Sequence, residues 1–210
     1  MKVAILSESP SDDAAIRLFA ETLLGRSTEP VDLPQLRSRG WPSVRNVFAA
    51  VYKGLWYQSD ADALIVMADS DDAAIHDPTH TGPAAGPRAC RFCELRQVEQ
   101  RVRAELRPLP NRAALRVAIG IATPAIEAWY AVGIDPHVNE PTWAQALASK
   151  QFPYTKAGLK KLIYGTDRPS LQLETEQAVE AAHRLGASLD ELIARFPSGF
   201  GPMANEIRSW

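Results

Sequence analysis

The amino-acid sequence predicts an α/β protein in which a mostly parallel sheet carries helices on both faces and a helical subdomain follows. Short apolar runs rich in branched residues, typical of strands buried on both faces, lie at residues 2–7, 64–68 and 115–122. Amphipathic helical patterns separate these runs, and strands that alternate with helices build parallel sheets through right-handed crossovers. After residue 135 only helical patterns continue.

The first predicted unit is a strand at residues 2–7, a turn and a helix. Ser11 or Asp12 can cap this helix, because their side chains accept hydrogen bonds from the free N–H groups of a first turn. The apolar positions then recur at helical spacing until Gly25, a residue suited to the left-handed conformation in which many helices end.

The second predicted unit begins with a weak strand. Residues 29–36 alternate polar and apolar side chains but contain two prolines, which is typical of an edge strand. Ser43 is the predicted N-cap of an amphipathic helix whose apolar positions continue to Leu55. The buried strand at 64–68 follows this helix.

A loop, a helix and a last strand complete the predicted sheet region. Residues 73–87 have no periodicity and form the loop, which leads to a helix at 92–106 and to the strand at 115–122. Thr123 and Pro124 match the N-cap and the first position of a further helix.

The predicted domains are an α/β domain over residues 1–135, which contains a long loop at 72–93, and a helical subdomain over residues 136–210. A chain of 210 residues with 46% hydrophobic content is long enough to bury a sizeable core. The helices predicted in the second domain cover residues 141–148, 156–164, 175–185, 189–196 and the tail after Pro202.

Composition narrows the classes of function. The net charge of −2 creates no overall basic field for nucleic acid, although residues 88–116 hold eight arginines against three glutamates. That excess suits phosphate contacts, but arginines interleaved with glutamates are more often the solvated face of a helix. No apolar run reaches the roughly 18 residues of a membrane span and no signal-peptide pattern opens the sequence, so we expect a cytoplasmic protein without a membrane partner.

Four acidic residues follow predicted strands or open the next element. Glu8 comes after the first strand, Asp69 and Asp71 follow the strand at 64–68, and Glu127 lies just beyond the last strand. Ligands of open α/β sheets bind outside the carboxyl ends of the strands, so we expect these side chains to form one site. Clustered carboxylates suit Mg²⁺ or Mn²⁺. The alternative is a solvated acidic turn that caps the next helix.

The same residues resemble the signature of the TOPRIM domains found in topoisomerases, bacterial primases and overcoming-lysogenization nucleases. That signature is a Glu after the first strand, usually followed by Gly, and a D-x-D after a later strand. Here Glu8 and the segment 69–71, D-S-D, stand at these places, with Ser9 where the family usually has Gly. The segment 123–129, T-P-A-I-E-A-W, is similar to the P-x-I/F-E-x-W segment of RloB-like TOPRIM proteins.

The resemblance implies a TOPRIM-like fold and a Mg²⁺-dependent nuclease that cleaves phosphodiester bonds in DNA or RNA. RloB-like proteins are often encoded near restriction or phage-defence genes, which implies a defence effector. Glu8 would be the general acid or base, or a metal ligand, while Asp69 and Asp71 would bind Mg²⁺ and Glu127 would complete the site. Two alternatives stay open. One is a catalytically silent TOPRIM-like subunit that works with a partner ATPase or another defence-system subunit, and the other is a phosphatase or phosphotransferase of small substrates.

A second metal site is predicted in the long loop. His76, His80, Cys90 and Cys93 read H-x₃-H-x₉-C-x₂-C and include both cysteines and half of the four histidines of the chain. Cys-x₂-Cys with two nearby histidines is typical of a closed structural Zn²⁺ site. The alternative is a pair of buried thiols beside two surface imidazoles.

Basic and aromatic side chains gather around residue 156. Lys156, Lys160 and Lys161 lie close in sequence to Phe152 and Tyr154, a mixture that can bind single-stranded nucleic acid by charge and stacking. We therefore predict nucleic-acid contacts for Lys156 and Lys160. The alternative is an amphipathic helix whose lysines lie in solvent.

Overall fold

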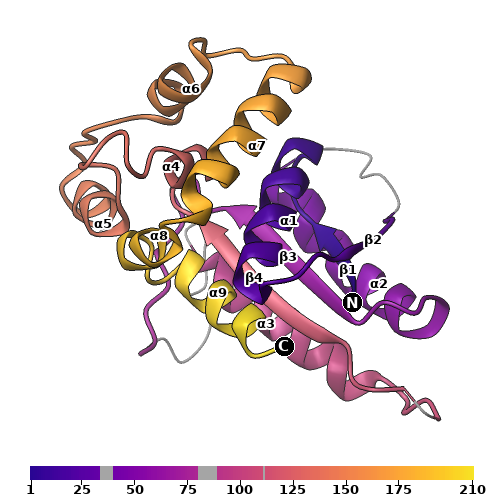
Figure 1. Ribbon diagram of the computed structural model, residues 1–210. Coiled ribbons are helices and arrows are strands. Elements are labelled where there is room, and N and C mark those ends of the chain that lie inside the picture. The colour runs from indigo at the N-terminus through magenta and orange to yellow at the C-terminus, as the bar shows by residue number, and fades with distance from the viewer. Residues whose placement is uncertain (34–39, 80–88, 111) are drawn as a thin grey trace.

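A single parallel sheet of four strands forms the centre of the computed structural model, which describes residues 1–33, 40–79, 89–110 and 112–210 (Figure 1). The strand order is β2–β1–β3–β4. The strands are β1 (Lys2–Leu6), β2 (Glu29–Val31), β3 (Ala63–Asp69) and β4 (Arg116–Ala122). The short β2 lies at the edge, as its proline predicted, and residues 34–36 of the predicted strand lie outside the described residues. The predicted α/β class with a parallel sheet is confirmed.

Helices cover both faces of the sheet. Helices α2 and α3 share one hydrophobic core with the sheet, whereas α1, α4, α7, α8 and α9 share the core on the opposite face. No helix in the described part of the chain combines the length and the apolar character needed to cross a membrane. The bounds are α1 (Pro10–Leu24), α2 (Trp41–Gln58), α3 (Arg91–Glu105), α4 (Ile126–Tyr130), α5 (Glu140–Ser149), α6 (Lys156–Tyr164), α7 (Leu171–Gly186), α8 (Leu189–Arg195) and α9 (Phe200–Arg208).

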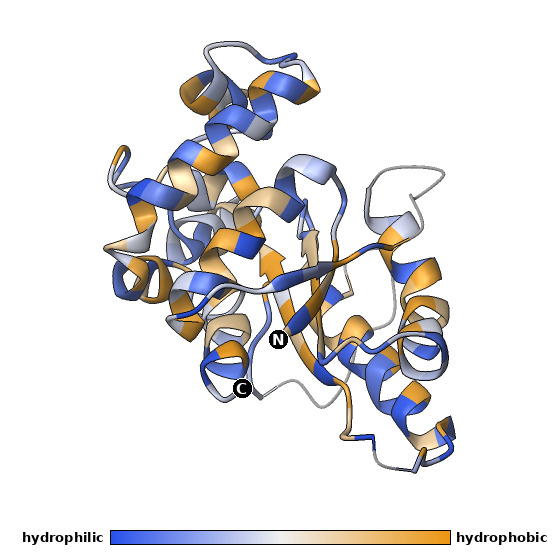
Figure 2. Cartoon of the chain, turned by 45° about the vertical axis from the view of Figure 1, so that its right-hand side comes forward, coloured by the Kyte–Doolittle hydropathy of each residue, from blue (hydrophilic) through white to orange (hydrophobic). Residues whose placement is uncertain are grey.

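Alternate residues of each strand enter the two cores. In β3, Ile65 and Met67 face the core of α1, α7 and α9, while Leu64 and Val66 face the core of α2 and α3. Because both faces are covered, β3 is apolar up to Ala68, and the central strands are largely orange between the helices in Figure 2. This burial explains the continuous apolar run seen in the sequence.

The C-terminal helices pack directly on the α/β part of the chain. Helix α7 lies along α1, and α9 lies on β4 (Figure 1). Phe200 of α9 meets Phe19 of α1 edge to face, with ring centroids 5.5 Å apart. Residues from both sides of position 135 thus build one core, and the division into domains at residues 1–135 and 136–210 stays a prediction.

Two helices begin earlier than predicted. Helix α1 begins at Pro10, so the prediction of Ser11 or Asp12 as its cap is wrong, and α2 begins before Ser43, the other predicted cap. Each helix has a proline in its first turn, where the missing N–H costs no hydrogen bond and the fixed φ suits the helix. Proline, and not a side-chain hydrogen bond, marks these two starts.

The helix after β4 begins later than predicted. Thr123 and Pro124, joined by a cis peptide bond, remain in the connection, and α4 starts at Ile126. The carbonyl of Pro124 accepts a hydrogen bond of 2.9 Å from the N–H of Asp71 and so continues the contact between the segments that follow β3 and β4. This contact holds the acidic segment after β3 against the start of α4.

Candidate metal sites at the carboxyl edge of the sheet

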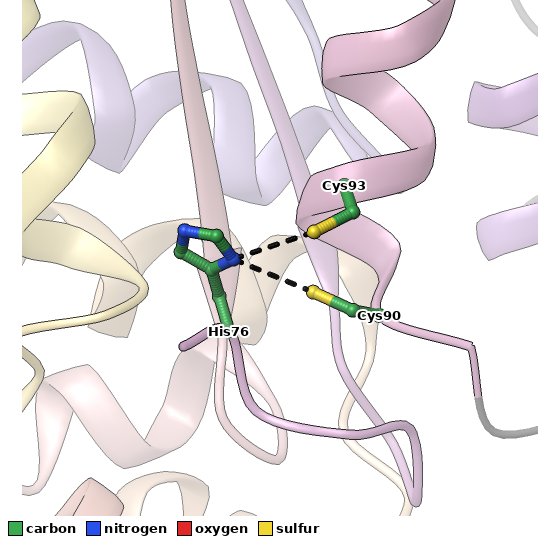
Figure 3. Close-up of side chains that lie close together, drawn as sticks. All are labelled: His76, Cys90 and Cys93. Atoms are coloured by element: carbon green, nitrogen blue, oxygen red, sulfur yellow. Dashed lines mark hydrogen bonds between the residues drawn. The ribbon is translucent and has the colours of Figure 1, made fainter. Parts of the chain in front are cut away.

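A histidine and both cysteines of the chain come together beside the sheet (Figure 3). Cys90 directly precedes α3 and Cys93 lies in its first turn, while His76 lies in the segment after β3. The Nδ1 atom of His76 is 3.7 Å from Sγ of Cys90 and 3.5 Å from Sγ of Cys93, and all three atoms lie within 4.8 Å of one another. The group is therefore able to bind a metal ion.

Two of the three distances in this group match the edges of a tetrahedral site. With Zn–S distances of about 2.3 Å and Zn–N distances of about 2.0–2.1 Å, a nitrogen and a sulfur at the tetrahedral angle lie about 3.6 Å apart. The two His76–cysteine distances of 3.5 and 3.7 Å bracket that value. His80, the predicted fourth ligand, lies outside the described residues.

A metal ion at this place must displace the proton of the Cys90 thiol. Both cysteines are free, and burial together with the neighbouring Cys93 raises the pKa of the Cys90 thiol to about 12. A thiol with that pKa keeps its proton at neutral pH unless a cation stabilises the thiolate. A bound metal ion supplies such stabilisation and releases the proton.

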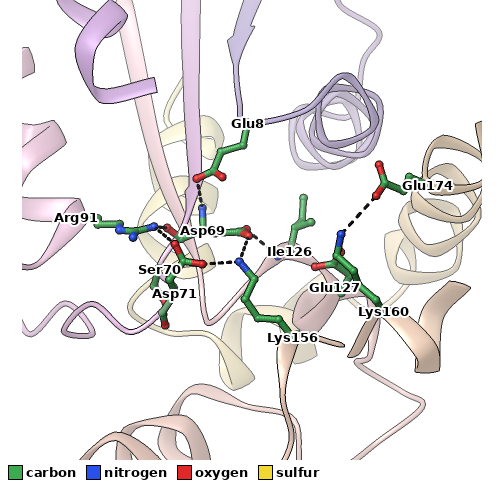
Figure 4. A network of polar contacts seen from close by, with 10 residues as sticks. All are labelled: Glu8, Asp69, Ser70, Asp71, Arg91, Ile126, Glu127, Lys156, Lys160 and Glu174. Atoms are coloured by element: carbon green, nitrogen blue, oxygen red, sulfur yellow. Dashed lines mark hydrogen bonds and ion pairs between the residues drawn. The ribbon is translucent and has the colours of Figure 1, made fainter. Parts of the chain in front are cut away.

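The predicted acidic residues meet at the carboxyl edge of the same sheet (Figure 4). Glu8 follows β1, and its Oε1 accepts a hydrogen bond of 3.1 Å from the N–H of Asp69, the last residue of β3. The Oδ1 of Asp69 accepts one of 3.1 Å from the N–H of Ile126 at the start of α4, next to Glu127. Parallel pairing of β1, β3 and β4 thus brings side chains far apart in sequence to one place, as predicted.

An ammonium group lies between two of these carboxylates. The Nζ of Lys156, the first residue of α6, donates hydrogen bonds of 2.9 Å to Oδ2 of Asp69 and of 2.5 Å to Oδ1 of Asp71. Asp71 has a positive φ of 49°, a conformation that aspartate tolerates better than most residues. The two carboxylates therefore converge on one cation.

Arg91 supplies a second positive charge, from the segment that holds the cysteines. Its Nη1 lies 2.8 Å from Oδ2 of Asp71 and donates a 2.5 Å hydrogen bond to the backbone carbonyl of Asp69. The guanidinium also lies over the ring of Trp41, 5.0 Å from its centroid. Arg91 was not among the predicted site residues, since no sequence pattern around it indicates contact with the aspartates.

The second predicted lysine faces acidic groups as well. The Nζ of Lys160 is 3.7 Å from Oε1 of Glu127 and 3.5 Å from Oε1 of Glu174 in α7 (Figure 4). Lys156 and Lys160 thus lie in the acidic site and make ion pairs there. Neither of the two expectations from the sequence, contact with nucleic acid or exposure to solvent, includes these ion pairs. Their contact with nucleic acid remains a prediction.

An open pocket of about 320 Å³ gives access to the acidic site. Its lining includes the buried Asp12, which the sequence suggested only as a helix cap. The lining also includes Glu174, whose place in the site no local sequence pattern predicts. Carboxylates in the lining outnumber the two lysines: the charged residues are Glu8, Asp12, Asp69, Glu127, Glu174, Lys156 and Lys160.

Burial and mutual repulsion shift the titration of these carboxyl groups. Burial, followed by the charge of Asp69, raises the pKa of Glu8 to about 7, and the same two causes raise the pKa values of Glu127 and Asp12. Burial also raises the pKa of Asp69. For Asp71, burial acts in the same direction, but the hydrogen bonds and charges of Lys156 and Arg91 outweigh it, so its pKa is lowered. A further cation in this site would relieve the repulsion.

The carboxylates of the acidic site are not positioned to bind a metal ion together in this structure. Among the described residues, no three of its carboxylates bring ligand oxygens within 4.8 Å of one another. The donor set of carboxylate oxygens nevertheless suits a hard divalent cation. Binding of Mg²⁺ or Mn²⁺ in the acidic site stays a prediction. Such binding requires the ammonium group of Lys156 to move away from the carboxylates of Asp69 and Asp71.

Comparisons of the chain with protein-family models, with curated proteins and with solved structures find no match. The resemblance to TOPRIM domains therefore rests on three motifs alone, Glu8, the segment 69–71 and the segment 123–129. The geometry and the chemistry of the two sites are what bear on function.

Proposed function

We propose that the protein is a metal-dependent nuclease of TOPRIM-like type, with Mg²⁺ or Mn²⁺ bound by Asp69, Asp71 and Glu8, and with Glu127 at the edge of the site. One observation carries the proposal: the carboxylates of Glu8, Asp69 and Glu127, at or just after the ends of β1, β3 and β4, line one open pocket, and Asp69 already shares a cation, the ammonium of Lys156, with Asp71. The TOPRIM-like motifs support nucleic acid as the substrate and phage defence as the setting.

The side chains of the site have distinct proposed roles. A bound divalent ion would polarise a phosphoryl oxygen and lower the pKa of a water molecule. In the metal-free site the pKa of Glu8 is raised to about 7, and a bound ion would lower it; Glu8 would act either as a ligand of the ion or, beside it, as a general acid or base. Lys156 and Lys160, once released from their carboxylate partners, pair with phosphate groups of the substrate.

A second function has support of its own. Lys156 and Arg91 already neutralise Asp69 and Asp71, so the site accepts a divalent ion only after Lys156 withdraws. A partner that moves α6, such as an ATPase or another defence-system subunit, could supply this step. The chain alone would then be a silent subunit, and cleavage would require the partner.

Cleavage assays separate these functions. We expect the purified chain with Mn²⁺ or Mg²⁺ to cleave plasmid DNA, single-stranded DNA or RNA, and Asp69→Asn to abolish this activity. Asp72→Asn, which changes an exposed acid of the same segment, is the matched control and should leave cleavage unchanged.

The other outcomes are also informative. Cleavage that survives Asp69→Asn contradicts the proposed site. Hydrolysis of small phosphate esters without cleavage of nucleic acid indicates a phosphatase instead. Mn²⁺ binding that depends on Asp69 but brings no cleavage supports the silent subunit.

We also infer that the His76–Cys90–Cys93 group binds a structural Zn²⁺, because two cysteines and a histidine whose nitrogen–sulfur distances are those of a tetrahedral site suit this ion. His80 is the proposed fourth ligand. Elemental analysis of protein purified without an affinity tag should find about one zinc per chain, and Cys90→Ser should lose it. Metal-free wild-type protein with two freely titratable thiols contradicts the site.

A further inference from the structure

Another pocket adjoins the acidic site at the carboxyl ends of β1 and β2. Its volume is about 430 Å³, within the range of roughly 300–1,000 Å³ that is usual for ligand pockets. The lining comes from the ends of these two strands, the start of α1 and the first residue of α7, and we call it the β1–β2 pocket. Glu8 and Ser9 line both pockets, so a ligand that binds in the acidic site can extend into the β1–β2 pocket.

Apolar side chains with exposed surface form part of the β1–β2 pocket. Pro10 at the start of α1 and Pro30 of β2 are exposed, and Leu171 at the start of α7 is 41% exposed. Contact of a ligand with these side chains would remove apolar surface from water. A flat ring with two apolar faces, such as a nucleic-acid base, would gain from this contact.

Two polar side chains of α1, those of Asp13 and Arg17, line the same pocket and are held by hydrogen bonds. Oδ1 of Asp13 accepts a hydrogen bond of 2.6 Å from the hydroxyl of Ser7, and Nη1 of Arg17 donates one of 3.1 Å to Oγ1 of Thr28. A carboxylate accepts hydrogen bonds from the amino groups of bases, and a guanidinium donates to their ring nitrogens and carbonyl oxygens. The pocket thus offers apolar contacts for the faces of a base and polar groups for its edge.

The charges of the β1–β2 pocket favour an uncharged part of a ligand. Its charged lining residues are the carboxylates Glu8, Asp13 and Asp32 and the guanidinium Arg17. Because negative charge predominates, a phosphate group would be repelled from this pocket. The phosphate groups of a nucleic acid instead suit the acidic site, where the proposed divalent ion and the two lysines supply positive charge.

We propose that the β1–β2 pocket binds an unpaired base of the nucleic acid, next to the phosphate group that lies at the acidic site. The inference rests on the proposed nuclease function and names its substrate class, which is single-stranded nucleic acid. In a duplex the faces of a base are stacked on its neighbours and its pairing edge is occupied, so a base must leave the duplex before it can enter such a pocket.

The first test is an NMR titration of the wild type and of two variants with deoxyadenosine 5′-monophosphate in the presence of Mg²⁺. Leu171→Glu places a charge on the apolar wall of the pocket. We expect its affinity to fall about tenfold, because contact with a partly exposed leucine contributes part of the free energy of full burial. A glutamate suits the first turn of a helix, so α7 should keep its fold.

Leu162→Glu is the matched control, because Leu162 of α6 is 43% exposed and does not line the β1–β2 pocket. This variant should bind the nucleotide as the wild type does. 2-Deoxyribose 5-phosphate, which lacks the base, should bind to all three proteins with similar affinity.

The second test needs no variant. With Mn²⁺ or Mg²⁺, the wild type should cleave a single-stranded oligonucleotide faster than the same sequence in a duplex. Equal nucleotide affinities of Leu171→Glu and Leu162→Glu, a wild type that binds no nucleotide, or equal cleavage of the two strand forms overturns the inference and leaves the proposed nuclease in place. A protein that binds the nucleotide as expected but cleaves no nucleic acid keeps the base-binding pocket and contradicts the proposed function.

Discussion

At the scale of single residues, Lys156 and a divalent ion compete for the same oxygens. Oδ2 of Asp69 and Oδ1 of Asp71 both contact the Nζ of Lys156, at 2.9 and 2.5 Å. A metal ion bound by these oxygens, at roughly 2.0–2.6 Å, would occupy the space of the ammonium group. The lysine therefore stabilises the metal-free site and opposes metal binding.

Removal of this lysine should strengthen metal binding. We expect Lys156→Gln to bind Mn²⁺ about tenfold more tightly than the wild type, a change of ~1.4 kcal/mol, because a competing charge is lost from a partly exposed site. Cleavage should fall at the same time, since the proposed phosphate contact is lost. Mn²⁺ titration followed by electron paramagnetic resonance measures the affinity, with Lys161→Gln on the exposed side of α6 as the control. Weaker Mn²⁺ binding in Lys156→Gln would show that the lysine supports the metal.

At the scale of elements, the two candidate sites share their supporting segments. Asp71 and His76 lie on the same segment after β3, and Cys90 and Cys93 flank Arg91, which contacts Asp71. A metal ion at the cysteine group would thus tie the start of α3 to the segment that carries the acidic site. The cysteine pair and the D-x-D motif, separate in the sequence, belong to one structural unit.

The sequence predicted the contacts that follow from a general rule of sheet geometry. Glu8, Asp69 and Glu127 could be placed together because parallel strands end at one edge of a sheet. Lys156 could not be assigned to that edge, because its partner Asp69 lies 87 residues away and no local pattern connects α6 with β3. Helix starts were misplaced where a proline, instead of a capping side chain, opens the first turn.

At the scale of the whole molecule, the acidic site makes stability depend on pH. The folded protein holds the proton of Glu8 up to a pH of about 7, well above the ordinary glutamate pKa of 4.5. Between these values the folded state binds more protons than the unfolded state, so the free energy of unfolding falls as the pH rises. The loss continues as the pH rises through the folded-state pKa of about 7 and then levels off. Charged groups around Glu8 include Asp69, Asp71, Lys156 and Asp12, and burial is the largest cause of the shift.

Glu8→Gln should remove this dependence, because glutamine keeps a similar size and cannot ionise. Without added divalent ions, we expect the variant to be more stable than the wild type at pH 8, on the order of 1–3 kcal/mol, and similar to it near pH 4.5. Urea unfolding at both pH values measures the difference, and Glu105→Gln, an exposed residue of α3 paired with Lys53, should show little change. Added Mn²⁺ should reduce the advantage of the variant, since the ion stabilises the ionised carboxylate in the wild type. A Glu8→Gln protein that is less stable than the wild type at pH 8 would mean that Glu8 is ionised and stabilised by its neighbours, and the acidic site would then need no further cation.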